Sequence, residues 1–380
     1  MTKIFVLAPD SFKESMAAEQ ACMAMQRGIL RAMPDAECIH VPMADGGEGT
    51  VDALIAALQG RRVECEVTGP LPAQKIQTYF GLIDEGKTAV IEMAKANGIH
   101  LLPIEQRNPL LTSTFGTGEM IAQALDLGVS KIILGLGGSV TNDAGAGMAH
   151  ALGAQFYDAA GNAVQGCGGQ LGRIRSIDLS ALDPRLQSAE ILIASDVNNP
   201  LCGANGASAV FGPQKGADAE MVQILDQNLS HFADAAEAEA GRSCRNIAGA
   251  GAAGGLGFGL MAFAGAKIQS GAALVIAQCR LAEKIAQADY VFTGEGKIDF
   301  QTKFGKTPFA VAQAAAQLHK PVIAFAGLVG EGIEELYALG FTRIIGINPP
   351  GCALQDALNN AEMHLENAAA ALMQNLAEHD

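Results

Sequence analysis

The sequence predicts an α/β protein with two domains, the first of which is a parallel-sheet domain assembled from both ends of the chain. Three observations lead to this prediction. Strand and helix patterns alternate at both ends, the middle of the chain follows a different pattern, and 380 residues correspond to two domains of about 150 residues or more. We therefore expect residues 1–68 and 266–380 to form the first domain, and residues 69–265 to form an inserted second α/β domain.

The first part of the chain alternates between strand and helix. Residues 3–8 form a short apolar run that is typical of a buried strand, and residues 37–42 form a second one. A second helix is expected up to residue 58, with Gly49 or Thr50 as its N-cap. The first helix is expected from about residue 15, because apolar residues recur at helical spacing: Ala18, Ala21, Cys22, Met25 and Ile29.

The last part of the chain repeats this alternation. We expect strands over residues 290–293, 322–326 and 343–347, and helices over residues 308–318 and 333–338. One more helix is expected at the C-terminus, where a single apolar face has spacings of three and four residues: Leu354, Leu358, Ala361, Leu365, Ala368, Leu372 and Leu376.

The middle of the chain follows a different pattern. Residues 75–82 and 88–93 predict a β-hairpin that turns at residues 84–86. Residues 131–135 and 190–194 predict two further strands, each followed by a long glycine-rich loop. This change of pattern is the reason for placing the inserted domain here.

Composition and charge exclude several classes of protein. Hydrophobic residues make up 49% of the chain and charged residues 17%, which excludes a disordered protein. The formal net charge is −15 and no run of Lys and Arg occurs, so we expect no nucleic-acid partner. The uncharged stretch 246–266 is rich in glycine and alanine, so we expect a glycine loop leading into a buried helix there and no membrane span.

The cysteines and the N-terminal sequence indicate the cellular compartment in which the protein is expected. The eight cysteines include no C-x-x-C pair and no metal-ligand spacing. This is typical of buried thiols in a reducing compartment. The apolar run before Pro9 is too short for a signal peptide and is better explained by a first strand. We therefore expect a cytoplasmic protein.

The segment from Gly81 to Thr88 matches G-x-x-x-x-G-K-[ST], the pattern of a phosphate-binding loop. Such a loop must open a helix, because the amides at the helix N-terminus hold the phosphates. The residues after Thr88 predict a strand instead, and Asp84 and Glu85 would place negative charge inside the loop. We interpret this match as a hairpin turn.

A second glycine-rich loop follows the predicted strand 131–135. A strand, a glycine turn with hydroxyl side chains and a helix follow one another here, which is the context of an anion site. Gly137, Gly138 and Ser139 are therefore candidates for binding a cofactor phosphate. A simple turn before a capped helix is the alternative.

A third glycine-rich loop matches G-x-G-x-x-G from Gly249 to Gly254. No convincing strand precedes it and no acid follows about 20 residues later, which argues against a dinucleotide site. A packing loop and a loop whose amides approach a phosphate are the two other interpretations. In the phosphate interpretation the cofactor-binding candidates are Gly251, Gly254 and Gly255.

Three acidic loops follow predicted strands. Ligands of open α/β sheets bind outside the carboxyl ends of strands, where carboxylates suit Mg²⁺ and glycine amides suit phosphate. Three such loops together favour a magnesium-phosphate site over three ordinary turns. Their candidates are Asp10 and Lys13 in the first loop, Asp45 in the second, and Gly294, Glu295, Gly296 and Asp299 in the third.

A further carboxylate and a further lysine are candidates for chemistry. Asp196 follows the predicted strand 190–194 and precedes a rigid Asn-Pro step, so it is a candidate general base, with a capping role as the alternative. Lys215 lies in a Gly-Pro-Gln-Lys-Gly loop. None of the seven histidines lies in these loops and no G-x-S-x-G surrounds Ser139, which argues against a histidine-centred hydrolase.

These loops, in this order, resemble the bacterial class I glycerate kinases. The resemblance implies phosphorylation of D-glycerate by ATP and Mg²⁺, with 2-phosphoglycerate as the usual product. It also implies a flavodoxin-like domain with an inserted domain of restriction-enzyme-like character. Two positions depart from the family pattern, since Asn198 replaces an Asp and Ala144 replaces a Gly. The matching segments are residues 8–15, 45–50, 137–139, 195–197, 199–201, 210–216, 249–255 and 293–306.

The resemblance and the loop chemistry together assign roles to these candidates. We expect Mg²⁺-ATP at the glycine loops, with Glu295 and Asp299 as metal ligands. Lys13 and Lys215 would neutralise a phosphate or the glycerate carboxylate. Asp196 is the expected base for the substrate hydroxyl, and Asp10 and Asp45 are the next candidates for that role.

Other functions stay open at this point. A glycerate 3-kinase would differ only in the hydroxyl group that it phosphorylates. A nucleotide-dependent oxidoreductase and a non-catalytic anion-binding module are rivals from other classes. The expected partner is the small molecule D-glycerate, with no nucleic acid and no membrane, and a homo-oligomer is left open.

Overall fold

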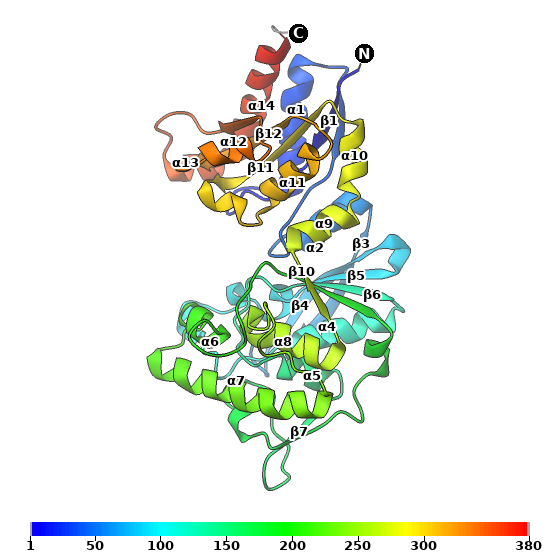
Figure 1. Ribbon diagram of the computed structural model, residues 1–380, viewed down its shortest axis with the longest axis vertical. Helices are drawn as coiled ribbons and strands as arrows, with labels where there is room; N and C mark the ends of the chain where they lie inside the picture. The colour runs from blue at the N-terminus through cyan, green and yellow to red at the C-terminus, as the bar shows by residue number, and fades with distance from the viewer. Residues whose placement is uncertain (1, 378–380) are drawn as a thin grey trace. The chain divides into compact units, whose positions relative to one another are not determined.

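The structure, a computed structural model, describes residues 2–377 (Figure 1). The chain forms two compact units. The first unit contains the residues up to 45, residues 52–59 and the residues from 272 onward, and the second contains residues 46–51 and 60–271. Each unit is built on a sheet with parallel strands, so the predicted α/β class is confirmed.

The first unit contains a five-stranded parallel sheet in the order β2-β1-β11-β12-β13. Counted within this sheet, the order is 2-1-3-4-5, which is that of flavodoxin-like doubly wound folds. The expectation from the family resemblance is therefore confirmed for this unit. The strands are β1 (Ile4–Leu7), β2 (Glu37–His40), β11 (Tyr290–Ile298), β12 (Val322–Val329) and β13 (Arg343–Gly346).

Two long helices from opposite ends of the chain, α1 (Ala18–Ala32) and α14 (Ala361–Ala377), lie side by side in this unit (Figure 1). Gly28 permits this close approach, because a Cβ atom there would lie 2.4 Å from the backbone oxygen of Glu366. Apolar side chains from both helices join the core of the sheet. The neighbouring helices are α2 (Thr50–Leu58), α9 (Gly271–Gln278), α10 (Leu281–Gln287), α11 (Thr307–Ala316), α12 (Glu334–Ala338) and α13 (Leu354–Asn359).

The C-terminal region forms two helices where the apolar spacing predicted one. Helix α13 ends before Asn360, whose φ of −113° and ψ of 13° are not helical, and α14 follows it. Leu365 and Leu372 of α14 are buried, whereas Leu354 of α13 is 75% exposed. The predicted single apolar face is therefore wrong for α13, because the apolar spacing continues through a break that only the backbone reveals.

The second unit contains a six-stranded mixed sheet in the order β3-β4-β5-β6-β9-β10. The pairs from β5 to β10 are parallel, whereas β4 is antiparallel to both of its neighbours. The strands are β3 (Arg61–Thr68), β4 (Lys75–Ile83), β5 (Thr88–Glu92), β6 (Lys131–Gly135), β9 (Glu190–Ala194) and β10 (Lys267–Gln269). A separate pair consists of β7 (Gln155–Tyr157) and β8 (Ser176–Asp178).

The compact units differ from the predicted domains at their boundaries. Strand β3 pairs with β4 along its whole length, from Arg61 opposite Leu82 to Thr68 opposite Lys75. Residues 61–68 therefore lie in the second unit, although we expected the first domain to extend to residue 68. Strand β10 pairs with β9 and also lies in the second unit. Hydrogen bonds to sequence-distant strands place both segments, and local composition does not reveal such pairing.

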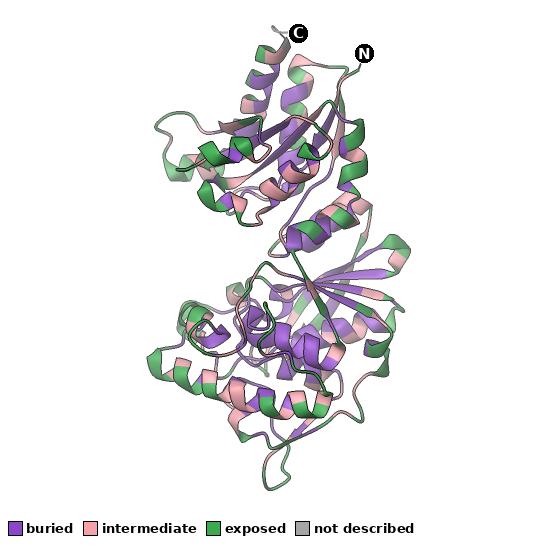
Figure 2. Ribbon diagram, viewed as in Figure 1, coloured by how far each residue is buried: buried purple, intermediate pink, exposed green. Residues whose placement is uncertain are grey.

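The helices of the second unit surround an apolar core (Figure 2). Helix α8 (Ala252–Ala264) is almost entirely buried, so the predicted buried helix is confirmed. Helix α7 (Ala219–Ala240), which we did not predict, is capped by the Asp218 carboxylate, which accepts a hydrogen bond from the Met221 amide. No helix among residues 2–377 is long and apolar enough to cross a membrane. The other helices are α3 (Ala94–Asn97), α4 (Phe115–Asp126), α5 (Ala146–Ala151) and α6 (Ala207–Phe211).

Candidate active site

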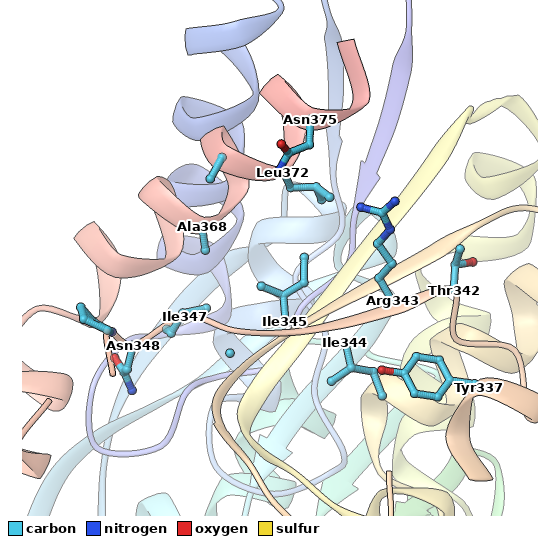
Figure 3. Close-up of a pocket in the computed structure, with 13 residues that line it drawn as sticks. Tyr337, Thr342, Arg343, Ile344, Ile345, Ile347, Asn348, Ala368, Leu372 and Asn375 are labelled. Atoms are coloured by element: carbon cyan, nitrogen blue, oxygen red, sulfur yellow. The ribbon is translucent and has the colours of Figure 1, made fainter. Parts of the chain in front are cut away.

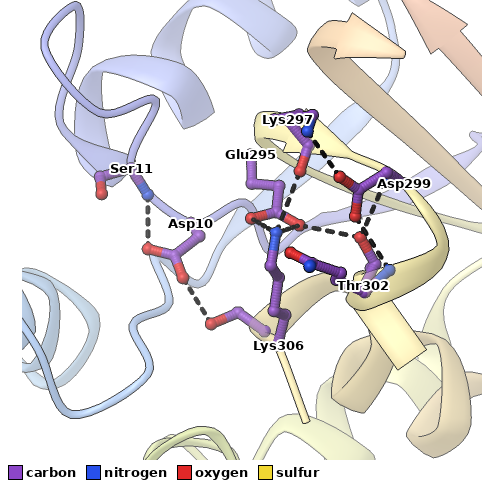
Figure 4. Close-up of polar contacts among 9 residues, drawn as sticks. Asp10, Ser11, Glu295, Lys297, Asp299, Thr302 and Lys306 are labelled. Carbon is purple, nitrogen blue, oxygen red and sulfur yellow. Dashed lines mark hydrogen bonds and ion pairs between the residues drawn. The ribbon is translucent and has the colours of Figure 1, made fainter. Parts of the chain in front are cut away.

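In the first unit, two candidate carboxylates meet where β1 and β11 run side by side (Figure 4). Asp10 follows β1, and its backbone N–H donates to the carbonyl oxygen of Gly294 at 2.9 Å. Glu295 is the next residue of β11 and points into the same cluster of side chains. Residues that are far apart in the sequence therefore form one acidic cluster.

The expected loop after residue 293 is a strand in the structure. Strand β11 continues to Ile298, and Gly294 and Glu295 pair with Phe325 and Ala326 of β12. A Cβ atom at Gly294 would lie 2.4 Å from the backbone oxygen of Phe325, so this glycine permits close strand packing. The structural reason for glycine at 294 is thus sheet packing, and a phosphate loop formed by Gly294 and Gly296 stays a prediction.

Glu295 is held by a lysine and a hydroxyl group. The Lys306 ammonium donates to both carboxylate oxygens at 3.3 Å, and the Thr302 hydroxyl donates to Oε1 at 3.3 Å. Burial raises the pKa of Glu295 to about 7, although the charge of Lys306 opposes this rise. Near neutral pH this carboxyl group is therefore poised between its two protonation states, and a bound cation would favour the ionised state.

Asp10 is anchored at both carboxylate oxygens. Oδ1 accepts from the Ser11 amide at 2.6 Å, and Oδ2 accepts from the Thr307 hydroxyl at 2.5 Å. Burial raises the pKa of Asp10 to about 6, and the negative charge of Asp45 acts in the same direction. Asp10 and Asp45 are therefore close enough to sense each other's charge, as expected for candidates at one end of a parallel sheet.

Asp299 and Lys13 have different surroundings from the Asp10–Glu295 pair. The Asp299 carboxylate forms an ion pair with Lys297 at 2.8 Å, which lowers its pKa. Its link to Glu295 is indirect, because the Thr302 hydroxyl accepts from the Asp299 amide and donates to Glu295. Lys13 is exposed. Asp10 acts on Glu295 through its charge, which raises the pKa of Glu295, whereas the charge of Asp299 is offset by Lys297.

This donor set fits a hard cation held together with phosphates. Among the residues that the structure describes, no group of three or more His, Cys, Asp or Glu side chains could hold a metal ion by itself. Mg²⁺ does not need such a cage, because it is usually bound by one or two carboxylates together with phosphates and water. Asp10 and Glu295 supply the carboxylate oxygens that such a site requires.

Sequence reasoning gave no role to the residues that anchor this cluster, Thr302, Lys306 and Thr307. Lys306 is the N-cap residue of α11 and Thr307 is its first residue. The Lys-Thr-Pro sequence at a helix start was the available signal, because Pro is favoured in the first turn of a helix. Only the fold shows that this helix start reaches Asp10 and Glu295.

In the second unit, the candidate loops follow two neighbouring strands. Gly135 at the end of β6 pairs with Ala194 at the end of β9. The Gly137–Ser139 turn and Asp196 therefore begin at the same edge of the sheet, and Asp196 is exposed there. A cavity of about 220 Å³ opens at this edge, lined by Ile99, Leu136, Gly137, Gly138, Ser139, Val197, Phe211, Gln214, Lys215 and Ala253.

Lys215 is a charged residue with only 1% of its surface exposed. Its ammonium donates to the Ser139 hydroxyl at 2.8 Å and to the Thr141 carbonyl oxygen at 2.7 Å. Burial lowers the pKa of Lys215 to about 7, while the charge of Asp143 opposes this change. The predicted anion-binding candidates Ser139 and Lys215, which are distant in the sequence, are thus in direct contact.

Asp143 organises the backbone behind this cavity. Its buried carboxylate accepts from the amide and hydroxyl of Thr114 and from the amides of Gly145 and Gly147. Burial raises the pKa of Asp143, and these hydrogen bonds oppose the rise. Ala144, which replaces a family glycine, has a φ of +51°. A left-handed conformation costs a non-glycine residue roughly 1–2 kcal/mol, so this network holds Ala144 in a strained conformation.

The contacts of the third glycine loop favour the packing interpretation. The amide of Gly251 donates to the Asn199 carbonyl oxygen at 2.9 Å, and the amide of Gly255 donates to the carbonyl oxygen of Gly251 at 3.4 Å. A Cβ atom at Gly254 would lie 2.0 Å from the Thr141 carbonyl oxygen. No strand of the described chain runs directly into this loop. These glycines therefore permit backbones to pack closely, and their role toward a phosphate stays a prediction.

The phosphate-loop match at residues 81–88 is a hairpin turn. Strands β4 and β5 are antiparallel neighbours, and a single 3₁₀ turn at Asp84–Gly86 connects them. The Lys87 side chain is 72% exposed and lies 3.8 Å from the Glu85 carboxylate. Thr88 begins β5 and opens no helix. The hairpin interpretation is confirmed.

A cavity of about 550 Å³ lies elsewhere in the first unit (Figure 3). It extends along the edge strand β13 and the facing side of α14, with Arg343, Asn348 and Leu372 among its lining residues. None of the candidate site residues lines it. Its walls carry no carboxylate, so it lacks the metal-binding chemistry of the Asp10–Glu295 cluster.

Comparison with known proteins gives one consistent result along the whole chain. The model of a family described as the glycerate kinase family matches residues 5–377. A curated protein of Haemophilus influenzae named glycerate kinase is 50% identical over 365 residues, covering 96% of each chain. A protein of Escherichia coli named glycerate 2-kinase is 47% identical over 356 residues, covering 94% of this chain and 93% of its own.

A solved structure agrees with these sequence relatives. The crystal structure from Salmonella typhimurium LT2 of a protein described as a putative glycerate kinase 2 has a TM-score of 0.91 with this chain. The two chains are 44% identical, and the match covers 100% of this chain and 99% of the other. Both units described above therefore have counterparts in that protein.

Proposed function

Since this chain belongs to the glycerate kinase family and is a phosphotransferase enzyme, we propose that it transfers the γ-phosphoryl group of ATP to the 2-hydroxyl group of D-glycerate. The single observation that carries this proposal is the match with a protein named glycerate 2-kinase over 94% of the chain. The acidic cluster and the Lys215 cavity supply chemistry that suits the two substrates.

The first unit carries the groups proposed for Mg²⁺ and nucleotide phosphates. Glu295 and Asp10 would hold the metal ion, with Asp45 and Asp299 as nearby carboxylates and Lys13 as a cation for a phosphate oxygen. When bound, Mg²⁺ would supply positive charge that offsets the charge developing on the transferred phosphoryl group. Lys306 keeps Glu295 in place through its two contacts of 3.3 Å.

The second unit carries the groups proposed for the acceptor. Asp196 follows β9 at the edge of the sheet where the 220 Å³ cavity opens. We assign it the role of general base, taking the proton of the glycerate hydroxyl as the oxygen attacks phosphorus. Its neighbour Asn198 is an amide and cannot take this role, although the family usually has an Asp there.

The position of phosphorylation gives the first testable prediction. We expect the product of the reaction with D-glycerate, Mg²⁺ and ATP to be consumed by added enolase without a phosphoglycerate mutase. Enolase acts on 2-phosphoglycerate, so absorbance of phosphoenolpyruvate should appear in step with ADP. ADP release that needs added mutase before enolase responds would identify the 3-hydroxyl group as the acceptor.

The same assay separates the rival functions. An oxidoreductase would change the absorbance of a nicotinamide cofactor and release no ADP. A non-catalytic anion-binding module would bind a substrate without turnover. Glycerate-dependent ADP release is expected only for the proposed kinase.

The hairpin at residues 81–88 gives the second prediction. Lys87→Ala is expected to leave the KM for ATP within about threefold of the wild type, because its ammonium lies on a strand turn and pairs with Glu85. A lysine that neutralised the β- and γ-phosphates would be needed for turnover. Loss of activity in a Lys87→Ala protein with a normal circular dichroism spectrum would contradict the interpretation of this segment as a hairpin turn with no role in binding ATP.

A cytoplasmic location completes the proposal. It is supported by the eight cysteines, all of which are free thiols in the structure, as is usual in a reducing compartment. Cell fractionation of the producing organism, with antibody detection of the protein, tests it.

A further inference from the structure

The cavity beside Lys215 has properties that the proposed reaction has not yet used. Its volume of about 220 Å³ is below the roughly 300–1,000 Å³ of pockets that take drug-sized ligands. A nucleotide is therefore too large for it, whereas a molecule with a few carbon atoms fits. Ile99, Leu136 and Val197 give it apolar walls.

The charge in this cavity lacks a partner of opposite sign. Lys215 has only neutral partners, the Ser139 hydroxyl and the Thr141 carbonyl oxygen. The acid whose charge influences it, Asp143, is already bonded to four donors. Within residues 2–377, no carboxylate forms an ion pair with Lys215. An ammonium group has three donors, so one N–H is left for a ligand.

Backbone donors lie beside this ammonium. The amides of Gly137, Gly138 and Ser139 donate to no acceptor in the part of the chain that the structure describes. Gly137 and Gly138 are exposed, Gly138 has a φ of +74°, and all three residues of the turn line the cavity. Successive backbone N–H groups in such a turn form a concave site for an anion.

We propose that this cavity is the subsite for the carboxylate of a small hydroxy acid, held by the Lys215 ammonium and the amides of the Gly137–Ser139 turn. The proposal rests on the proposed function, and it specifies which part of the acceptor is recognised in the second unit. The apolar walls contact the carbon chain. A buried ammonium with neutral partners is costly to maintain, and a carboxylate ligand supplies the missing charge.

Lys215→Met tests this subsite, because methionine fills similar space without a charge. With saturating Mg²⁺-ATP, the KM for D-glycerate should rise by about 30-fold or more, which is typical of truncating one partner of a buried charge pair. The KM for ATP should stay within about threefold. Lys267→Met, which removes an exposed lysine of the same unit, is the matched control and should leave both constants unchanged.

Gln214→Glu provides a second test that does not disturb a buried group. Gln214 is exposed and lines the cavity, so the variant adds a negative charge where a carboxylate is expected to bind. Relative to Gln214→Ala, which removes the same amide without adding a charge, the KM for D-glycerate of Gln214→Glu should be about fivefold higher or more through repulsion between like charges. If Lys215→Met does not fold, the Gln214 pair decides the question.

Three outcomes would overturn the subsite. The KM for ATP could rise while that for D-glycerate stays constant, which would make this a phosphate site. The second contrary outcome is that both KM values stay at the wild-type level in every variant. The Gln214→Glu and Gln214→Ala proteins could behave alike.

Failure of the proposed function would look different. In that case the wild-type chain would release no ADP with D-glycerate. Calorimetric titration of D-glycerate into the wild type and into the Lys215→Met or Gln214→Glu protein then tests the subsite without turnover. Equal binding by wild type and variants, or no binding to the wild type, would contradict it.

Discussion

Asp196→Asn is expected to lower the turnover number for D-glycerate phosphorylation by at least about 10², within the range of 10²–10⁴ that a general base contributes. The glycerate hydroxyl is a poor nucleophile while it is protonated, and a carboxylate can take its proton as the bond to phosphorus forms. Asparagine keeps the shape of the side chain and removes its basicity. The KM for ATP should barely change, because Asp196 belongs to the acceptor side of the reaction in our proposal.

Steady-state rates of ADP release measure this effect. Asp126→Asn is a suitable control, because Asp126 is an exposed aspartate of the same unit that forms a surface ion pair with Arg185. Such pairs contribute little, so its rate should match the wild type. A 10²-fold loss in Asp10→Asn, with Asp196→Asn near wild type, would instead make Asp10 the base. A fall in ATP affinity in Asp196→Asn would indicate a metal ligand.

Glu295→Gln should reduce kcat/KM for Mg²⁺-ATP by about 10²–10³. The charge that a metal ion offsets on a phosphoryl group is worth several kcal/mol, and about 1.4 kcal/mol corresponds to a tenfold change in rate. The amide keeps the hydrogen bond from Thr302 but removes the negative charge beside Lys306. The Mg²⁺ concentration for half-maximal activity should rise about tenfold or more.

Titration of activity with Mg²⁺ at fixed ATP checks this prediction. Glu335→Gln is the matched control, since Glu335 also pairs with a lysine of the first unit, Lys303, but its side chain is 69% exposed. Its Mg²⁺ dependence should equal that of the wild type. If Glu295→Gln keeps the wild-type Mg²⁺ dependence, Glu295 is not a metal ligand and serves only to anchor Lys306. Asp10 must then be tested as the metal ligand.

Local patterns in the sequence determined much of this protein. The β-α alternation predicted the parallel sheet of the first unit, because a strand and a helix bury apolar residues at different spacings. The residues after Thr88 distinguished a hairpin from a phosphate loop, because a run of apolar residues that continues as a strand cannot also open a helix. The positions of Asp10 and Asp45 after two strands were also enough to predict that they share one edge of a sheet.

Tertiary structure alone decided how the charged groups are surrounded. Lys306 reaches Glu295 of strand β11 from the start of helix α11, and Lys215 reaches Ser139 across 76 positions of sequence. Strand β3 joined the second unit through eight residue pairs with β4. Local spacing carries information about which face of a strand or helix is apolar. Local spacing carries no information about which distant strand will pair with a given strand, or which ammonium group will be buried without a carboxylate. Both depend on desolvation and contacts that exist only in the folded chain.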